Sequence, residues 1–270
     1  MAANEAERKR WDDERMAERW PKRERFTDAV TPYVLRALAP RPGEKMLEVG
    51  SGGGKLAMAA GQAVSPGGKV VGADISRAMV GLAESRLKAA RASNVSFRVA
   101  DVQTDSIPGG PFDAAISQFG VMFFEEPVTA FANIRAHLER GGRLAFACWQ
   151  PVERNPWFSG PALAAFATPP PPLAPGKSPT GPFAFGNPRR VRGILHDAGF
   201  TAVTRSPHLI HVRLPADTLI DDAQLDVMGV APEKRPEALE ALRKHMEALT
   251  LPDGRCRFPL AFQVFTARNP

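Results

Sequence analysis

The sequence is poor in cysteine and tyrosine. Its 270 residues include two cysteines, Cys148 and Cys256, and a single tyrosine, Tyr33. Two cysteines cannot form a disulfide-rich scaffold or a cysteine-rich zinc site, and so few fit a reducing compartment. No set of histidine, cysteine and carboxylate residues has the spacing of metal ligands, so we predict no metal. With 16 phenylalanines against one tyrosine, we expect an aromatic pocket in this chain to be apolar.

Long hydrophobic runs are also missing. Residues 1–15 are mostly charged and contain no apolar export signal. No run of about 18 apolar residues occurs, so we expect no membrane span and a cytoplasmic location. The net charge of +6 allows an acidic partner. No block of Lys and Arg with interleaved aromatic residues stands out, however, so we expect no nucleic-acid partner.

What the sequence does contain, from residue 45 to residue 149, is apolar strands alternating with amphipathic helices. Strands are predicted at 45–50, 69–75, 95–101, 112–120 and 143–149, with helices between them. This alternation predicts right-handed βαβ units and an α/β fold with a doubly wound, mostly parallel sheet. Ligands of such sheets bind at the carboxyl ends of the strands.

Two further regions flank the alternating pattern. Residues 1–40 are predicted to form a helical arm or cap, with its charged first part broken at Pro21. Residues 41–270 then form the main domain. Nine of the 26 prolines lie between positions 161 and 188, so we expect an irregular lid insertion at about 155–187. A helix with Asn187 as its N-cap and Pro188 at its first position should follow.

The remaining C-terminal elements complete the domain. Strands are predicted at 201–213 and 258–267, and a helical insertion is predicted at about 217–248.

A glycine-rich turn follows the first strand, over residues 48–54 with the sequence Glu-Val-Gly-Ser-Gly-Gly-Gly. Glycines allow the backbone to approach a ligand closely. Residues 52–57 also fit the relaxed dinucleotide pattern G-x-G-x-x-A, which leaves an NAD(P)-dependent oxidoreductase as an alternative. A pyrophosphate at this turn is disfavoured by a nearby carboxylate, whereas a cationic ligand is favoured by one. Glu48 therefore favours the cationic ligand, unless it only accepts hydrogen bonds from the amides of the turn.

Two other acids follow their strands in the same way. Asp74 ends the second strand and could accept both hydroxyl groups of a ribose. Asp101 ends the third strand, where a side-chain oxygen could accept the amine of an adenine. Both acids could instead cap turns. Because the three acids each lie at a strand end, we expect them to face one ligand.

Together these segments resemble the class I S-adenosylmethionine-dependent methyltransferases. The resemblance is carried by LEVGSGGG at 47–54, VVGADIS at 70–76, FRVAD at 97–101, FDAAISQFGVMFF at 112–124 and GGRLAFACWQ at 141–150. It covers residues 10–150 closely and 181–270 more loosely. Within the class, the chain is most similar to the small-molecule group that includes the ubiquinone/menaquinone-type enzymes.

The resemblance implies a seven-stranded, Rossmann-like sheet with strand order 3-2-1-4-5-7-6, in which the last strand is antiparallel. It implies S-adenosyl-L-methionine as the cofactor and S-adenosyl-L-homocysteine as its product. The implied cofactor site consists of Glu48, Gly50, Ser51, Gly52, Asp74, Ile75, Met79, Asp101, Val102, Ser117, Gln118 and Phe119. Relatives often carry a small or basic residue at the position of Gln118. Ser117 and Gln118 could instead satisfy the end of their own strand.

Methyl transfer from a sulfonium is an in-line displacement, driven by proximity and by exclusion of water. We expect the acceptor pocket to include Trp20, Met122, Trp149, Asn155, Trp157 and Phe183, and hence a small apolar or aromatic acceptor. No catalytic triad is evident. His208 and His211 are the candidate bases, although their spacing places them on opposite faces of a strand. Cys148 ends the fifth strand and is expected to be a buried, inert thiol.

Two further alternatives stay open on the sequence. A nucleic-acid methyltransferase fits the positive charge, but the fourth strand ends in Ser-Gln-Phe-Gly rather than the Asn/Asp-Pro-Pro-aromatic pattern of enzymes that methylate base amines. A cofactor-binding protein without catalysis is the other alternative. We expect a monomer or a homodimer.

Overall fold

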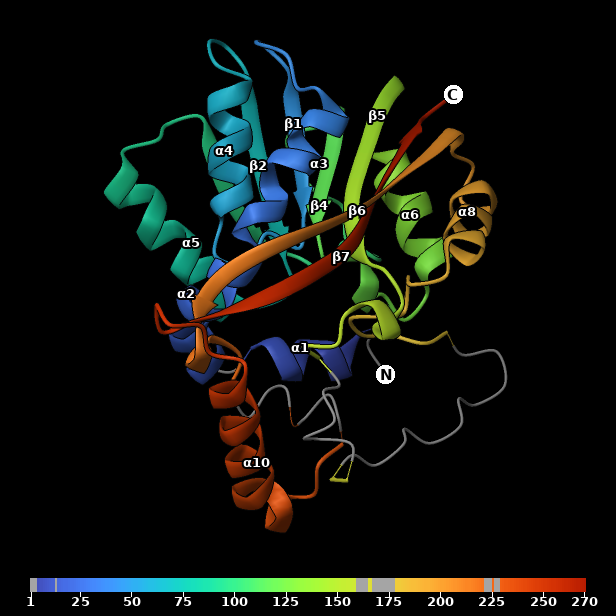
Figure 1. Cartoon of the computed structure of the whole chain (residues 1–270). Helices are drawn as coiled ribbons and strands as arrows, with labels where there is room; N and C mark the ends of the chain where they lie inside the picture. Colours follow the sequence, from blue (N-terminus) through green and yellow to red (C-terminus); the bar gives the residue numbers. More distant parts are fainter. Residues whose placement is uncertain (1–3, 13, 159–164, 167–177, 221–224, 226–228) are drawn as a thin grey trace.

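The computed structural model describes residues 4–12, 14–158, 165–166, 178–220, 225 and 229–270. A seven-stranded sheet forms its centre (Figure 1). The strands are β1 (Lys45–Val49), β2 (Lys69–Asp74), β3 (Val95–Val99), β4 (Phe112–Gln118), β5 (Leu138–Trp149), β6 (Thr201–Pro215) and β7 (Arg255–Arg268). Their order is β3-β2-β1-β4-β5-β7-β6, which confirms the predicted order.

The first five strands are parallel, and β7 runs antiparallel to both β5 and β6. The C-terminal strand is therefore inserted between β5 and the edge strand β6, as the resemblance implies. Strand β5 begins at Leu138, five residues earlier than predicted, and includes the glycine pair at 141–142. Its early part pairs with the start of β4 through an irregular register.

Helices α4 (Lys55–Ala63), α5 (Arg77–Ala90), α6 (Pro127–Ala136) and α8 (Pro188–Asp197) flank the sheet. Helix α10 (Arg235–Ala248) packs against 3-10 turns and lies below the sheet in Figure 1. Helices α4 and α5 pack against β2 and β3, and α6 packs against β5 and α8. The Asn187 side chain accepts hydrogen bonds from the amides of Arg189 and Arg190, which confirms the predicted N-cap of α8.

The N-terminal arm contains α1 (Glu5–Trp11), α2 (Glu14–Thr27), the short 3-10 helix η1 (Asp28–Val30) and α3 (Thr31–Leu38). Helix α3 packs across β4, β5 and β7, whereas α1 and α2 lie below the sheet in Figure 1. The prediction that Pro21 breaks the charged segment is wrong, because α2 continues through it. Pro21 is exposed, so water can satisfy the carbonyl that loses its helical partner.

Two predicted insertions are described only in part. The proline-rich lid expected at about 155–187 includes residues 159–164 and 167–177, which lie outside the described residues. The helical insertion expected at 217–248 includes 221–224 and 226–228, which also lie outside them. Its described part contains the 3-10 turns η4 (Ala216–Leu219) and η5 (Pro232–Lys234) and the helix α10. No helix in the described part of the chain is long and apolar enough to cross a membrane.

The hydrophobic core lies around the middle strands. Leu47, Ile116, Phe146 and Phe265 are fully buried on β1, β4, β5 and β7. Burying a side chain of this size stabilises the fold by about 1.5–3 kcal/mol. The Cys148 thiol is buried among these residues and donates to the carbonyl of Phe185, and burial raises the pKa of Cys148 far above its ordinary value. This packing supports the expectation of an inert thiol.

Candidate functional site

A cavity of about 260 Å³ lies at the carboxyl ends of the parallel strands. Every strand from β1 to β5 contributes residues from its end or from the loop that follows it. The N-terminal arm forms the opposite wall, with Asn4, Glu7, Trp11, Trp20, Arg23, Glu24, Phe26, Thr27, Asp28 and Thr31. The cavity thus lies where ligands of doubly wound sheets bind.

All but one of the residues predicted to bind the cofactor line this cavity. Those that line it are Glu48, Gly50, Ser51, Gly52, Asp74, Ile75, Met79, Asp101, Val102, Gln118 and Phe119. Ser117 does not. Its hydroxyl is fully buried and donates to the carbonyl of Val49 at 2.7 Å, which ties the end of β4 to the end of β1. The prediction for Ser117 is corrected to this role in joining two strand ends.

The glycine turn approaches the loop after β4 very closely. Gly50 has φ +69°, and a Cβ added there would lie 2.8 Å from the Cα of Gly120. On the other side of the turn, a Cβ added to Gly52 would lie 2.9 Å from the Trp20 ring. Glycine is therefore required at Gly50 by the backbone conformation and by the lack of space.

Glu48 is a buried carboxylate with one free oxygen. The backbone N–H of Ala57 interacts with this carboxylate, but Oε2 has no hydrogen-bond partner among the residues that the structure describes. Burial raises the pKa of Glu48 well above its ordinary value, and the nearby Asp74 and Glu24 carboxylates raise it further. The buried Ser51 hydroxyl, also on the cavity wall, likewise has no partner within the described part.

An unsatisfied buried carboxylate and hydroxyl are costly, so such atoms in a native site call for a ligand or water. A cationic donor such as an ammonium group would satisfy both.

Asp74 braces the glycine turn while it lines the cavity. One carboxylate oxygen accepts from the Gly52 amide at 2.8 Å and the other from the Ser76 amide at 2.9 Å. Burial raises the pKa of Asp74, and these two hydrogen bonds oppose the rise. A carboxylate has about four lone-pair sites, so Asp74 keeps acceptor capacity toward the cavity. Bracing the turn and accepting a ligand are therefore compatible.

Asp101, which follows β3, also lines the cavity. Its side chain accepts from the Gln103 amide at 3.0 Å, as expected of a residue that caps a turn. The Asn4 side-chain amide also donates to it, at 2.8 Å to Oδ1 and 3.0 Å to Oδ2. Burial raises the pKa of Asp101, and these hydrogen bonds oppose the rise. The Asn4 contact joins positions 97 residues apart, and no local signal in the sequence predicts it.

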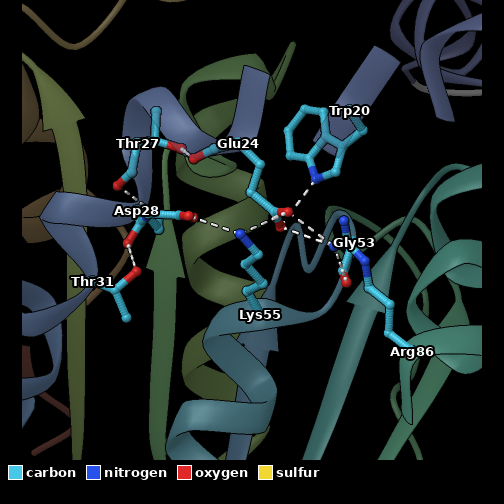
Figure 2. A network of polar contacts seen from close by, with 9 residues as sticks. Trp20, Glu24, Thr27, Asp28, Thr31, Gly53, Lys55 and Arg86 are labelled. Carbon is cyan, nitrogen blue, oxygen red and sulfur yellow. Dashed lines mark hydrogen bonds and ion pairs between the residues drawn. The ribbon is translucent and has the colours of Figure 1, made fainter. Parts of the chain in front are cut away.

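The arm is fixed to the glycine turn through Glu24 (Figure 2). The Glu24 carboxylate is 8% exposed and lies 2.9 Å from Arg86 Nη1 and 3.3 Å from Lys55 Nζ. The Trp20 indole N–H also donates to it, at 3.3 Å. These residues come from α2, α4 and α5, so the contact joins three helices at the edge of the cavity. Sequence reasoning missed Glu24, because nothing distinguishes it from the other charges of the arm.

The same network extends to the backbone of the turn. Arg86 Nη1 donates to the Gly53 carbonyl at 2.8 Å, and Lys55 Nζ lies 2.7 Å from Asp28 Oδ2. Glu24 and Arg86 are the more buried members of this network, whereas Lys55 and Asp28 are each 42% exposed. The arm is therefore part of the cavity wall in this structure.

The three acids and the glycine turn line one half of the cavity, which we call the cofactor half. Aromatic rings line the other half, which we call the acceptor half. Phe119 stacks on Trp149 with centroids 4.1 Å apart and planes 12° apart. Trp157 lies edge-on to Trp149 at 5.1 Å and to Phe26 at 4.4 Å. Phe158 follows at 5.7 Å from Trp157. Of the residues predicted for the acceptor pocket, Met122, Trp149 and Trp157 line this half, whereas the Trp20 ring lines the cavity against the glycine turn. Phe26 and Phe158 also line the cavity and were missed.

Phe119 connects the two halves. It follows β4 directly and has φ +63°, which is uncommon for a residue with a side chain. Its amide donates to the Ala147 carbonyl at 3.0 Å, and this bond helps to hold the unusual conformation. Such conformations cost free energy and are concentrated at functional sites.

Two residues predicted for the acceptor pocket do not line the cavity. Asn155 is fully buried, where its side chain exchanges two hydrogen bonds with the backbone of Ala261 at 2.9 and 3.0 Å. It also accepts from the Trp157 indole N–H at 3.1 Å, so it acts by positioning Trp157. Phe183 packs edge-on against Phe158 at 4.7 Å, behind the wall. Both support the wall from behind.

The candidate bases lie elsewhere. His208 packs between the Tyr33 ring at 4.7 Å and the Phe262 ring at 5.1 Å, and burial lowers the pKa of His208. His211 is exposed on the edge strand β6. Neither lines the cavity. They belong to β6, which β7 separates from the parallel strands that form the site.

Comparisons with known proteins agree with this geometry. The family described as "Methyltransferase domain" matches residues 46–142. Nocamycin O-methyltransferase of Saccharothrix syringae is 29% identical over 71% of each chain. Aklanonic acid methyltransferase of Streptomyces sp. strain C5 is 33% identical over 44% of this chain and 53% of that enzyme.

A solved structure, phosphoethanolamine N-methyltransferase 2 of Haemonchus contortus in complex with S-adenosylhomocysteine, has a similar fold. Its TM-score is 0.54 at 15% identity, over 89% of this chain and 52% of that one. The strand order, the matched domain and the named relatives lead to one family. They support a class I S-adenosylmethionine-dependent methyltransferase.

Proposed function

We propose that this protein transfers the methyl group of S-adenosylmethionine to a flat, largely apolar small molecule. The observation that carries the proposal is the division of one cavity into two halves. One half holds Glu48, Asp74 and Asp101, and the other is lined by aromatic rings. A cofactor in the first half and an acceptor in the second would meet near Phe119.

The first half fits the cofactor. The unpartnered Glu48 Oε2 and Ser51 Oγ suit its α-ammonium group, and Asp74 suits its ribose hydroxyls. Asp101 suits the adenine amine, with Ile75, Met79 and Val102 as apolar neighbours. The bound cofactor supplies a methyl group on a sulfonium, which needs no further activation. A free carboxylate beside the glycine turn disfavours a pyrophosphate, which argues against the dinucleotide alternative.

The second half offers shape and exclusion of water. Gln118, a polar residue of its wall, donates to the Thr27 carbonyl at 3.1 Å and accepts from the Thr31 hydroxyl at 2.9 Å. Its amide is thus engaged by the arm. Neither the single tyrosine nor any of the five histidines lines the cavity. We therefore infer that no histidine or tyrosine acts as the base, and that the chain contributes alignment and desolvation.

The relatives support a small acceptor. The name of the first relative refers to O-methylation of nocamycin, and the second is named for aklanonic acid. In this proposal residues 1–40 cap a methyltransferase domain formed by 41–270. The proline-rich insertion at 155–187 contributes Trp157, Phe158 and Pro182 to the acceptor half.

A thermal-shift titration tests the cofactor assignment. The wild type and Asp74→Ala are each titrated with S-adenosylhomocysteine, NADH and NADPH. A ligand at about 100 times its Kd adds about 2.7 kcal/mol of stability, a shift of a few degrees for this size. We expect S-adenosylhomocysteine alone to stabilise the wild type, and Asp74→Ala to lose most of this shift. The Asp113→Ala variant, at the opposite end of the sheet, should keep the shift. Stabilisation by a nicotinamide nucleotide instead would refute the proposal.

A further inference from the structure

The N-terminal arm contacts the cofactor half of the cavity at each of the three acid-bearing strand ends. Glu24 binds Arg86 beside the glycine turn. The junction of α1 and α2 contacts the start of α5 next to Asp74, where the Ala78 amide donates to Asp12 at 3.1 Å. At the third strand end, Asn4 contacts Asp101. The first two contacts join the arm to residues beside the predicted cofactor ligands, whereas the third engages a predicted ligand itself.

Asn4 is placed to occupy the ligand position at Asp101, next to the end of β3. Its side chain is buried and its Nδ2 lies in front of both Asp101 oxygens, at 2.8 and 3.0 Å. Its Oδ1 accepts from the Glu125 amide at 3.0 Å. A carboxamide therefore presents a donor to a carboxylate and an acceptor to a backbone N–H. The N6 and N1 atoms of adenine offer the same pair of groups side by side.

The local conformation of Asn4 supports a specific role. Asn4 is the N-cap residue of α1, a position where asparagine normally accepts a hydrogen bond from the helix. No such cap is made. The residue instead adopts φ 56° and ψ 23°, a left-handed conformation that asparagine tolerates better than most residues. The side chain is thus directed away from its own helix and toward Asp101.

We propose that Asn4 is an internal ligand of the adenine subsite and that the adenine of the cofactor displaces it. This inference rests on the proposed assignment of Asp101 to adenine. Asn4 Nδ2 donates to both carboxylate oxygens and its Oδ1 accepts from the Glu125 amide, so Asn4 occupies the acceptor and donor groups that the N6 and N1 edge of an adenine would use. The contacts at Asp12 and Glu24 do not involve Asn4, so only the start of α1 has to move.

The consequence is a reduced cofactor affinity. Only molecules in which Asn4 has left Asp101 can bind the adenine. The measured affinity is therefore lowered in proportion to the fraction of such molecules. Removal of the Asn4 amide should then tighten binding of S-adenosylhomocysteine. If Asn4 instead helped Asp101 to hold adenine, its removal would weaken binding. The sign of the change separates the two roles.

Calorimetric titration with S-adenosylhomocysteine of the wild type, Asn4→Ala and Glu5→Gln measures this sign. Glu5 is the next residue along the chain but does not line the cavity. We expect Asn4→Ala to bind roughly tenfold to a hundredfold more tightly than the wild type, the effect of losing a competing hydrogen bond to a charged group. Glu5→Gln should match the wild type.

Hydrogen exchange of the Arg8 amide, which donates to the Asn4 carbonyl at 2.8 Å, gives a second readout. We expect S-adenosylhomocysteine to reduce the protection of this amide in the wild type, because the start of α1 moves. Binding to the wild type with equal or weaker binding to Asn4→Ala, or with unchanged Arg8 protection, would overturn the inference and leave the proposed function intact. Absence of binding to all three proteins would overturn both.

Discussion

The two halves of the cavity are built in different ways. In the cofactor half, Glu48, Asp74 and Asp101 lie at or next to the ends of β1, β2 and β3, and backbone N–H groups hold each carboxylate. In the acceptor half, rings from separate segments of the chain pack edge-on or stack, as Phe26, Trp149 and Trp157 do. One half offers fixed polar atoms, and the other offers apolar surface.

This difference predicts different responses to mutation. Hydrogen bonds to charged groups contribute about 1.5–3 kcal/mol each, so the loss of one polar group in the cofactor half should change ligand affinity strongly. Apolar contacts are individually small and are shared among several rings. The loss of one ring should leave cofactor affinity almost unchanged.

The largest effect is expected from Gly50→Ala. The added Cβ would lie 2.8 Å from the Gly120 backbone, and the residue would keep φ +69°. We expect a loss of about 2–4 kcal/mol of stability and a loss of S-adenosylhomocysteine affinity of roughly a hundredfold. Denaturant unfolding and calorimetry measure the two effects.

The matched control is Gly81→Ala. Gly81 lies inside α5, and a Cβ there meets nothing within 4 Å. This variant should gain about 1 kcal/mol of stability from helix propensity and keep its affinity. Wild-type affinity in Gly50→Ala would contradict the close-packed turn.

A smaller effect, dependent on pH, is expected from Glu48→Gln. Burial raises the pKa of Glu48 in the free protein, and a bound ammonium group favours the ionised form. Below the raised pKa, binding therefore requires loss of a proton, and affinity for S-adenosylhomocysteine should increase as pH rises toward that pKa. Glu48→Gln should bind roughly tenfold more weakly above the raised pKa, with little dependence on this ionisation. Calorimetry across a pH series tests this, with the exposed Glu84→Gln as the control.

The same ionisation affects stability. A carboxyl group whose pKa is raised on folding favours the folded state below its ordinary pKa, and this contribution is lost as pH rises through the folded pKa. Glu48→Gln should therefore become more stable relative to the wild type as pH rises. A constant difference in melting temperature across the series would show that Glu48 does not titrate in the folded protein.

The cofactor half could be predicted from the sequence because its residues are local to the strands. Each acid lies at or just after a strand end, and the fold brings those ends together. Where a residue had two possible partners, the sequence could not decide between them. Ser117 and Asn155 lie next to the site but bond to the backbone of Val49 and Ala261 rather than facing the cavity. Asp74 and Asp101 both cap turns and face the cavity.

The arm could not be placed in the same way. The Glu24–Arg86 and Asn4–Asp101 contacts join residues 62 and 97 positions apart. The spacing of apolar residues indicates which face of a helix is apolar, but it does not indicate which strand end that helix covers. Two tryptophans in a highly charged segment, Trp11 and Trp20, are the indication in the sequence that the arm lies against other parts of the chain. Phe26 could not be distinguished from a core residue.

The most direct test of the two-half cavity is the affinity of Asp74→Ala and Trp157→Ala for S-adenosylhomocysteine, measured by calorimetry beside the wild type. Trp157 contacts Phe26, Trp149 and Phe158 in the acceptor half. Our account predicts a loss of roughly tenfold to a hundredfold for Asp74→Ala and a change within about twofold for Trp157→Ala. Equal losses in the two variants, or a larger loss in Trp157→Ala, would contradict it.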